Sequence, residues 1–170
     1  HAIISNTIYP DLFKMSSGIQ KDNLIKECSF HYKKALEIYP DYIVSNNNLG
    51  SIYFTFLGDY KTALYYFNKA VSLDTGYLEA FYNLAYSYEN TGKPDSAVFY
   101  FEKALKIKPS YQPAYDRLYN LYFSSAQYDK AIDLNLRAAS NIPHLSALYF
   151  VNTGNIYSTK KDTLQALNYF

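Results

Sequence analysis

A recurring spacing of 34 or 35 residues constrains the fold of this chain more than any other feature of its sequence. Ala63, Ala97 and Ala131 stand 34 residues apart, and Ala166 follows after 35. Further tyrosine, alanine and proline residues keep the same spacing, namely Tyr53, Tyr88, Tyr122, Tyr157, Ala70, Ala104, Ala138, Pro109 and Pro143. A period of this length indicates a supersecondary unit that buries its apolar side against neighbouring copies of itself.

The clearest copy spans residues 78–109 and has the pattern of two amphipathic helices. When each residue advances by about 100° around a helix, one face of the first half is apolar. That face consists of Phe81, Leu84, Ala85 and Tyr88. Gly92 suits a left-handed helix cap, and Pro94 suits the first turn of a following helix. The sequence therefore predicts a helix-turn-helix unit.

These residues resemble the tetratricopeptide repeat family over nearly the whole chain. The family pattern is an aromatic residue, Leu-Gly, Tyr, Ala, Phe, Ala and Pro. It is matched best by Phe81, Leu84-Ala85, Tyr88, Ala97, Phe101, Ala104 and Pro109. The resemblance implies an all-α fold, a right-handed superhelical solenoid of paired helices whose first members line a concave groove. It also implies a scaffold for protein–protein interaction.

We expect a single solenoid over residues 1–170, built from five units. The units run over about 9–42, 43–77, 78–111, 112–146 and 147–170, the last of them truncated. The first unit should be the least regular, because Ser16-Ser17-Gly18 interrupts its first helix. Residues 1–8 suit either the end of an earlier helix or an irregular lead.

The last residues, Asn168-Tyr169-Phe170, lack the polar face that caps a repeat array. We therefore expect this soluble segment to be excised from a longer protein of unknown location. Self-association through the truncated ends is left open as an alternative.

The fourth unit departs from the family pattern at two positions. Tyr119 stands where glycine or alanine is usual, which predicts that the helices of this unit are spread locally. Asn135 replaces the aromatic residue of the second helix, and we expect Leu134 or Leu136 to cover its place. Both departures concern local packing and leave the predicted fold unchanged.

Composition and charge disfavour several classes of function. The net charge of +1 argues against a nucleic-acid surface, which needs a basic stripe. No segment approaches the apolar length of a membrane span, so we expect no membrane contact by this segment. The single cysteine, Cys28, excludes an internal disulfide and occupies a small-residue position of the repeat, which favours a packed thiol.

The notable polar residues recur on the predicted first helices. Asn48, Asn83, Arg117 and Asn152 share one repeat position, just before the Leu-Gly pair or its equivalent. Neighbouring positions on the same face hold Asn47, Tyr82, Tyr86, Asn120 and Asn155. An asparagine side chain both donates and accepts hydrogen bonds, so a row of them can pair with the backbone of an extended peptide. We therefore predict a peptide-binding groove formed by these nine residues.

This row resembles the asparagine ladder in the repeat region of O-GlcNAc transferases. The resemblance implies an alternative in which the chain is the substrate-recruiting arm of a larger enzyme, such as a glycosyltransferase. A third hypothesis, a helical repeat that binds RNA, is disfavoured by the near-neutral charge. A clamp for the acidic tails of heat-shock chaperones is also disfavoured, because Arg117 is the only basic residue predicted on the groove face.

The sequence gives little support to catalysis by this segment. Its histidines, His1, His31 and His144, are scattered, and no His-x-x-x-His or Cys-x-x-Cys spacing suggests a metal site. No glycine-rich loop suggests a nucleotide. We expect no enzymatic activity and no cofactor.

Tyrosines on the predicted outer faces form a separate feature. Tyr65, Tyr66 and Tyr100 lie on second helices, away from the predicted groove. They suit either partial packing against the neighbouring unit or a second interface. The sequence leaves both possibilities open.

Overall fold

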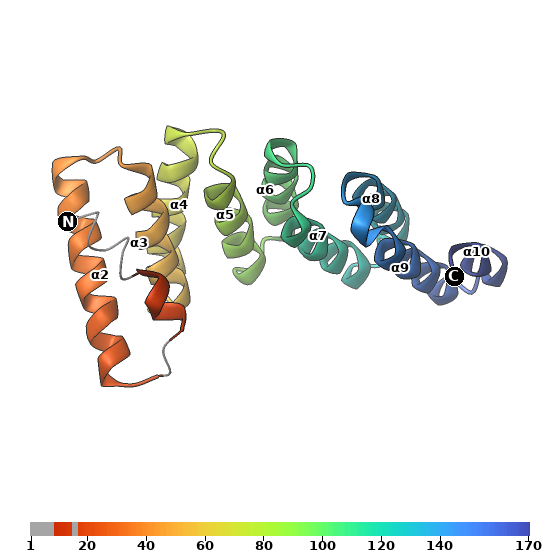
Figure 1. Cartoon of the computed structure of the whole chain (residues 1–170), viewed down its shortest axis with the longest axis horizontal. Coiled ribbons are helices and arrows are strands. Elements are labelled where there is room, and N and C mark those ends of the chain that lie inside the picture. The colour runs from red at the N-terminus through yellow and green to blue at the C-terminus, as the bar shows by residue number, and fades with distance from the viewer. Residues whose placement is uncertain (1–8, 15–16) are drawn as a thin grey trace. The chain divides into compact units, whose positions relative to one another are not determined.

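The computed structural model describes residues 9–14 and 17–170, and these residues form helices joined by short turns, with no strand among them (Figure 1). The predicted all-α class is confirmed. The expectation for residues 1–8 and part of the predicted break at Ser16-Ser17-Gly18 lie outside the described residues. Across the described part, every helix is too short or too polar to span a lipid bilayer.

The chain divides into two compact units, residues 1–93 and 94–170, and each is described by itself. The N-terminal unit contains the 3-10 helix η1 (Tyr9–Phe13), α2 (Ile19–Ile38), α3 (Ile43–Thr55), α4 (Tyr60–Leu73) and α5 (Leu78–Asn90). Each of its α-helices packs against the next, and α3 also contacts α5. Consecutive pairing of this kind is the expected packing of a helical repeat.

The C-terminal unit follows the same scheme. It contains α6 (Pro94–Ile107), α7 (Gln112–Ser124), α8 (Tyr128–Asn141), the 3-10 helix η2 (Pro143–Leu145), α9 (Ser146–Thr159) and α10 (Thr163–Tyr169). Here too, each α-helix packs against its successor. The helices α3, α5 and α7 begin at the predicted repeat boundaries, while the division of the chain into five repeats of one solenoid remains a prediction.

Small residues are buried at the same repeat position throughout the chain. Ala63, Ala97 and Ala131 are 0% exposed, and Ala166 is 3% exposed. In the N-terminal unit, a Cβ atom built on Gly50 would lie 2.8 Å from the ring of Phe67, which is too close for any side chain. The α3–α4 contact therefore depends on a glycine facing a buried phenylalanine.

The fourth repeat exchanges the sizes of this pair. Tyr119 occupies the position equivalent to Gly50, and Asn135 occupies the position equivalent to Phe67. Asn135 fills its buried position itself, at 1% exposed, and its Nδ2 has no hydrogen-bond partner. The ring of Tyr119 stacks on Phe123, with ring centroids 5.6 Å apart, and packs against the buried cluster of Ala131, Ile132 and Ile156.

This arrangement modifies the expectation for Asn135. Leu134 is buried, at 2% exposed, whereas Leu136 is 38% exposed and does not cover the position. In this repeat the large side chain therefore stands on the first helix, α7, and the smaller amide stands on the second helix, α8.

The turns and the single thiol follow simple physical rules. Gly58 ends the turn after α3 with φ of 65°, a conformation that favours glycine. The carboxylate of Asp59 accepts hydrogen bonds from Thr62 Oγ1 (2.6 Å) and Thr62 N (3.0 Å), which caps α4 and lowers the pKa of Asp59. Cys28 is fully buried, and burial, with a smaller contribution from Glu27, raises the pKa of its thiol to about 11.

Candidate ligand-binding surface on the first helices

The N-terminal unit brings three of the predicted asparagines into one hydrogen-bonded cluster. Asn83 on α5 donates from Nδ2 to Asn47 Oδ1 on α3 (3.0 Å) and to Ser51 Oγ (3.4 Å). Asn47 Nδ2 donates to Asn48 Oδ1 (3.2 Å), and Asn48 Nδ2 donates to Tyr32 OH on α2 (2.9 Å). We call Tyr32, Asn47, Asn48, Ser51 and Asn83 the amide cluster.

These bonds fix the orientation of each amide. Asn47 is only 5% exposed and is therefore the buried member of the three asparagines, whereas Asn48 and Asn83 are half-buried. No described residue donates a hydrogen bond to Asn83 Oδ1. The cluster therefore presents at Asn83 a carbonyl oxygen that is held in place and still able to accept.

Aromatic side chains lie beside the amide cluster on the same two helices. Tyr82 and Tyr86 on α5 stack with ring centroids 6.4 Å apart and planes 14° apart. Phe54 on α3 packs against Tyr86 at 5.3 Å and against Tyr60 at the same distance. Tyr82 and Tyr86 are half-buried, so they offer apolar area together with a polar hydroxyl.

Asn90 contributes little to this surface. Its Nδ2 donates to the backbone oxygen of Tyr86 (2.8 Å), one turn earlier in α5. Its donor is therefore used within its own helix.

The C-terminal unit holds the remaining predicted site residues. Arg117 and Asn120 lie on α7, and Asn152 and Asn155 lie on α9. Asn120 and Asn155 are exposed, and Asn152 is half-buried. The side-chain amides of these three asparagines make no hydrogen bond to any described residue. Unlike the amides of the N-terminal unit, they retain all of their hydrogen-bonding capacity.

Two charged residues sit among them on α7. Burial raises the pKa of Asp116, and this effect is partly offset by a hydrogen bond that Gln112 Nε2 donates (3.4 Å) and by the positive charge of Arg117. Arg117 is half-buried. An arginine in this setting can form a charge-assisted hydrogen bond to an anionic group.

Sequence reasoning did not identify Tyr149 as part of this region. Its ring lies 6.2 Å from that of Tyr115, where α9 meets α7, and its hydroxyl is buried without a hydrogen-bond partner. Burial raises the pKa of Tyr149 to about 12, with smaller contributions from Asp116 and Tyr115. A signal was present, because the equivalent repeat positions hold the small residues Ser45, Ala80 and Ala114.

Each unit therefore carries its own part of the predicted surface. The N-terminal unit brings together Asn47, Asn48, Tyr82, Asn83 and Tyr86, and the C-terminal unit carries Arg117, Asn120, Asn152 and Asn155. A single row through both units remains a prediction. Within the described part of the chain, histidine, cysteine, aspartate and glutamate nowhere gather in threes that could hold a metal ion.

Comparison with known families agrees with the helix-turn-helix repeat. Residues 31–65 and residues 78–111 each match a tetratricopeptide repeat model. These two segments are recognised as tetratricopeptide repeats. The first of these TPR segments includes all of α3, and the second includes α5 and α6.

Several solved structures resemble the chain over most of its length. A crystal structure of MamA is 25% identical in sequence to this chain, and the match covers 92% of each of the two chains with a TM-score of 0.73. MamA from Desulfovibrio magneticus RS-1 is 20% identical, over 99% of this chain and 90% of that one, with a TM-score of 0.71. YrrB, reported as a TPR protein with an unusual peptide-binding site, is 22% identical, over 89% of this chain and 77% of that one, with a TM-score of 0.67.

The likenesses to YrrB and to the Desulfovibrio MamA concern the fold alone. Among curated protein sequences, none is similar enough to this chain to count as a match.

Proposed function

We propose that the chain is a protein-interaction scaffold that holds an extended peptide segment against its first helices. The observation that carries this proposal is the amide cluster, which fixes the side chain of Asn83. No described residue donates to Asn83 Oδ1, so this oxygen can accept a hydrogen bond from a ligand. A backbone N–H group of a bound peptide is the simplest donor for that oxygen.

The charge distribution favours recognition of an uncharged segment. The helices α3 and α9 contain no charged residue at all. The helices α5 and α7 together contribute Glu79, Glu89, Asp116 and Arg117. With so few charges, hydrogen bonds from amides and contact with the rings of Tyr82 and Tyr86 supply most of the affinity.

The C-terminal unit offers the same chemistry with fewer internal constraints. The side-chain amides of Asn120, Asn152 and Asn155 bond to no described residue, so a ligand does not have to break existing hydrogen bonds to reach them. The ladder-like use of these asparagines, as in the O-GlcNAc transferase repeats, is part of this proposal. No contact in the described residues favours the alternative of a substrate-recruiting arm.

The test begins with selection of ligands from a random library of 12-residue peptides displayed on phage, with the full chain as bait. The double variant Asn152→Ala/Asn155→Ala should weaken binding of the selected peptides by about tenfold, which corresponds to about 1.4 kcal/mol. Its melting temperature should stay the same, because neither amide bonds to any residue that the structure describes.

The matched control is Asn23→Ala, which changes an exposed asparagine on α2. This variant should bind the selected peptides as the parent does. Full affinity in the double variant would remove these asparagines from the binding mechanism.

A further inference from the structure

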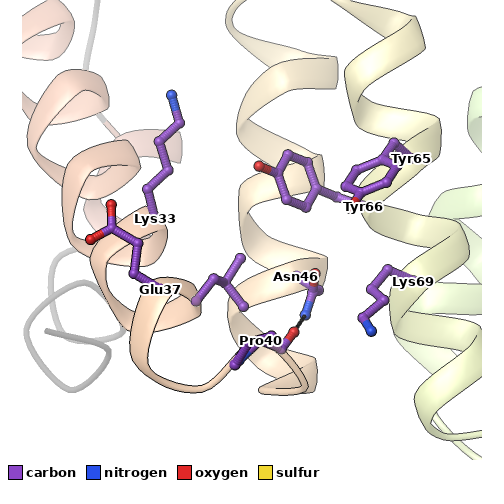
Figure 2. A pocket seen from close by; sticks show the side chains of 8 residues that line it. Lys33, Glu37, Pro40, Asn46, Tyr65, Tyr66 and Lys69 are labelled. Carbon is purple, nitrogen blue, oxygen red and sulfur yellow. Dashed lines mark hydrogen bonds between the residues drawn. The ribbon is translucent and has the colours of Figure 1, made fainter.

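A pocket of about 420 Å³ lies between the second helices α2 and α4 of the N-terminal unit, and no residue of the amide cluster lines it (Figure 2). Lys33 and Leu36 line it from α2, Tyr66 and Lys69 line it from α4, and Asn46 lies at its base. Figure 2 shows Lys33 and Lys69 on opposite walls with their ammonium groups pointing apart. The proposed peptide surface does not use this pocket.

The C-terminal unit shows what the same two repeat positions do when their charges are opposite. Two repeats after Lys33 stands Glu102 on α6, and two repeats after Lys69 stands Arg137 on α8. Arg137 Nη2 and Glu102 Oε1 form an ion pair at 2.7 Å, on the wall of an equivalent pocket of about 360 Å³. Side chains at these positions can therefore meet across two consecutive second helices.

In the N-terminal unit the anion of this pair is missing. Lys33 forms no ion pair with any described residue, and its ammonium lies 5.4 Å from the centre of the Tyr53 ring. A hydrogen bond that Lys33 donates to Tyr53 raises the pKa of Lys33, so the side chain is charged at neutral pH. Among the described residues, Lys69 forms an ion pair only with Asp41 (2.7 Å), whose side chain is 72% exposed.

The other charged residue that lines the pocket has its own partner. Glu37 pairs with Lys34 on the same helix at 2.7 Å. The ammonium groups of Lys33 and Lys69 therefore share one described ion-pair partner between them. That partner is the exposed carboxylate of Asp41, which pairs with Lys69.

Uncharged groups complete the pocket. Tyr66 points from α4 toward α2 in Figure 2, and its hydroxyl bonds to no described residue. Its ring is held by stacking on Tyr53, with centroids 5.8 Å apart. Burial raises the pKa of Tyr66, so the hydroxyl keeps its proton and can donate. Asn46 is anchored by hydrogen bonds from its Nδ2 to the backbone oxygens of Pro40 (3.2 Å) and Tyr42 (3.1 Å).

We infer that this pocket binds a glutamate or aspartate side chain of a protein partner, which supplies the anion that Glu102 supplies in the C-terminal unit. The partner's carboxylate pairs with Lys33 and accepts a hydrogen bond from the Tyr66 hydroxyl. Lys69, on the opposite wall, adds positive charge to the pocket, and Leu36 covers the aliphatic part of the ligand. The site lies on second helices, so its partner can be bound together with a peptide on the first helices.

The probe is the capped peptide acetyl-Leu-Glu-Leu-amide, titrated into the ¹⁵N-labelled full chain and followed by NMR. Saturable shifts should appear at the backbone amides around Lys33, Tyr66 and Lys69. Binding should weaken as salt rises, because the contact is ionic and partly exposed. The matched peptide acetyl-Leu-Gln-Leu-amide should produce no saturable shift.

Two substitutions of one residue sharpen the test. Lys33→Met should reduce affinity for the glutamate peptide at least fivefold, whereas Lys26→Met, at an exposed position of α2, should not change it. Lys33→Glu should abolish binding without lowering the melting temperature, because it recreates the pairing seen between Glu102 and Arg137.

Three results would overturn the inference. They are equal binding of the glutamine peptide, full affinity in Lys33→Met, and saturable shifts confined to residues outside the pocket. Inorganic phosphate that binds as tightly as the glutamate peptide would show a general anion site and overturn the assignment to a protein side chain.

Discussion

The exchange of large and small residues in the fourth repeat leads to a quantitative prediction about stability. Gly50 faces Phe67 in the N-terminal unit, and Gly154 faces Phe170 in the same way, with a built Cβ only 2.7 Å from the ring. In the fourth repeat the equivalent residues are Tyr119 and Asn135. If the two positions share one space, substitutions at them must be strongly coupled.

Each single substitution should destabilise the protein. Tyr119→Gly removes a half-buried ring and places glycine in a helix, which costs about 3 kcal/mol in the free energy of unfolding. Asn135→Phe inserts a ring opposite Tyr119, although the Gly50–Phe67 pair has no room for even a methyl group. Overpacking of this kind costs roughly 1–3 kcal/mol.

The double variant Tyr119→Gly/Asn135→Phe should recover most of this loss. It restores the pairing seen between Gly50 and Phe67, and it removes the buried Nδ2 of Asn135 that lacks a partner. Leaving such a group unsatisfied costs about 1–3 kcal/mol. We therefore expect a coupling free energy of about 3 kcal/mol between the two positions, at the upper end for neighbouring residues.

The assay is urea unfolding of the parent, both single variants and the double variant, followed by far-UV circular dichroism. Equal slopes of free energy against urea across the four proteins would establish that the same transition is compared. If the loss in the double variant equals the sum of the two single losses to within about 0.5 kcal/mol, the two positions do not share one space, because independent sites are additive.

Three further predictions follow from the packing, the turn and the buried thiol. Gly50→Ala should lower the free energy of unfolding by about 1–3 kcal/mol, because Phe67 is 1% exposed and cannot move aside; an unchanged urea midpoint would contradict the close contact. Gly58→Ala should cost about 1 kcal/mol through its φ of 65° alone, since a Cβ there meets no atom within 4 Å; a loss as large as that of Gly50→Ala would argue against this distinction. The pKa of the Cys28 thiol is raised from 9.0 to about 11, so its contribution to stability is fully present below pH 9 and is lost as the pH rises through 11. In urea titrations, Cys28→Ala should therefore lose stability less steeply than the parent over this range. An identical slope of unfolding free energy against pH in the two proteins would exclude the contribution.

The sequence predicted the helices because their signals are local and periodic. The alanines at positions 63, 97 and 131 indicated which faces pack, and these alanines are buried. Glycine at 92 indicated the turn between the helices of the clearest copy, and it adopts a positive φ. Such features depend on the residue type and its spacing, so one sequence is enough to read them.

The contacts between side chains were not accessible in the same way. The sequence predicted Asn83 on the first helix of its repeat, and it lies on α5. Its hydrogen bonds to Asn47 and Ser51 could not be predicted, because they depend on how closely α3 approaches α5. The exposed fraction of Leu136 and the burial of Asn135 depend on how α8 packs against its neighbouring helices. The sequence did not indicate a site at Lys33 and Lys69. Only the ion pair between Glu102 and Arg137 shows that these repeat positions face each other.

The hydrogen bonds of the amide cluster all run in one direction, from Asn83 through Asn47 and Asn48 to Tyr32. Turning over the amide of Asn83 would set two carbonyl oxygens against each other unless Asn47 and Asn48 turned as well. In the proposed peptide complex, Asn83 Oδ1 would therefore accept from a peptide N–H group and would not pair with a peptide carbonyl oxygen. A segment with proline at the matching point has no N–H group to offer and should be rejected there.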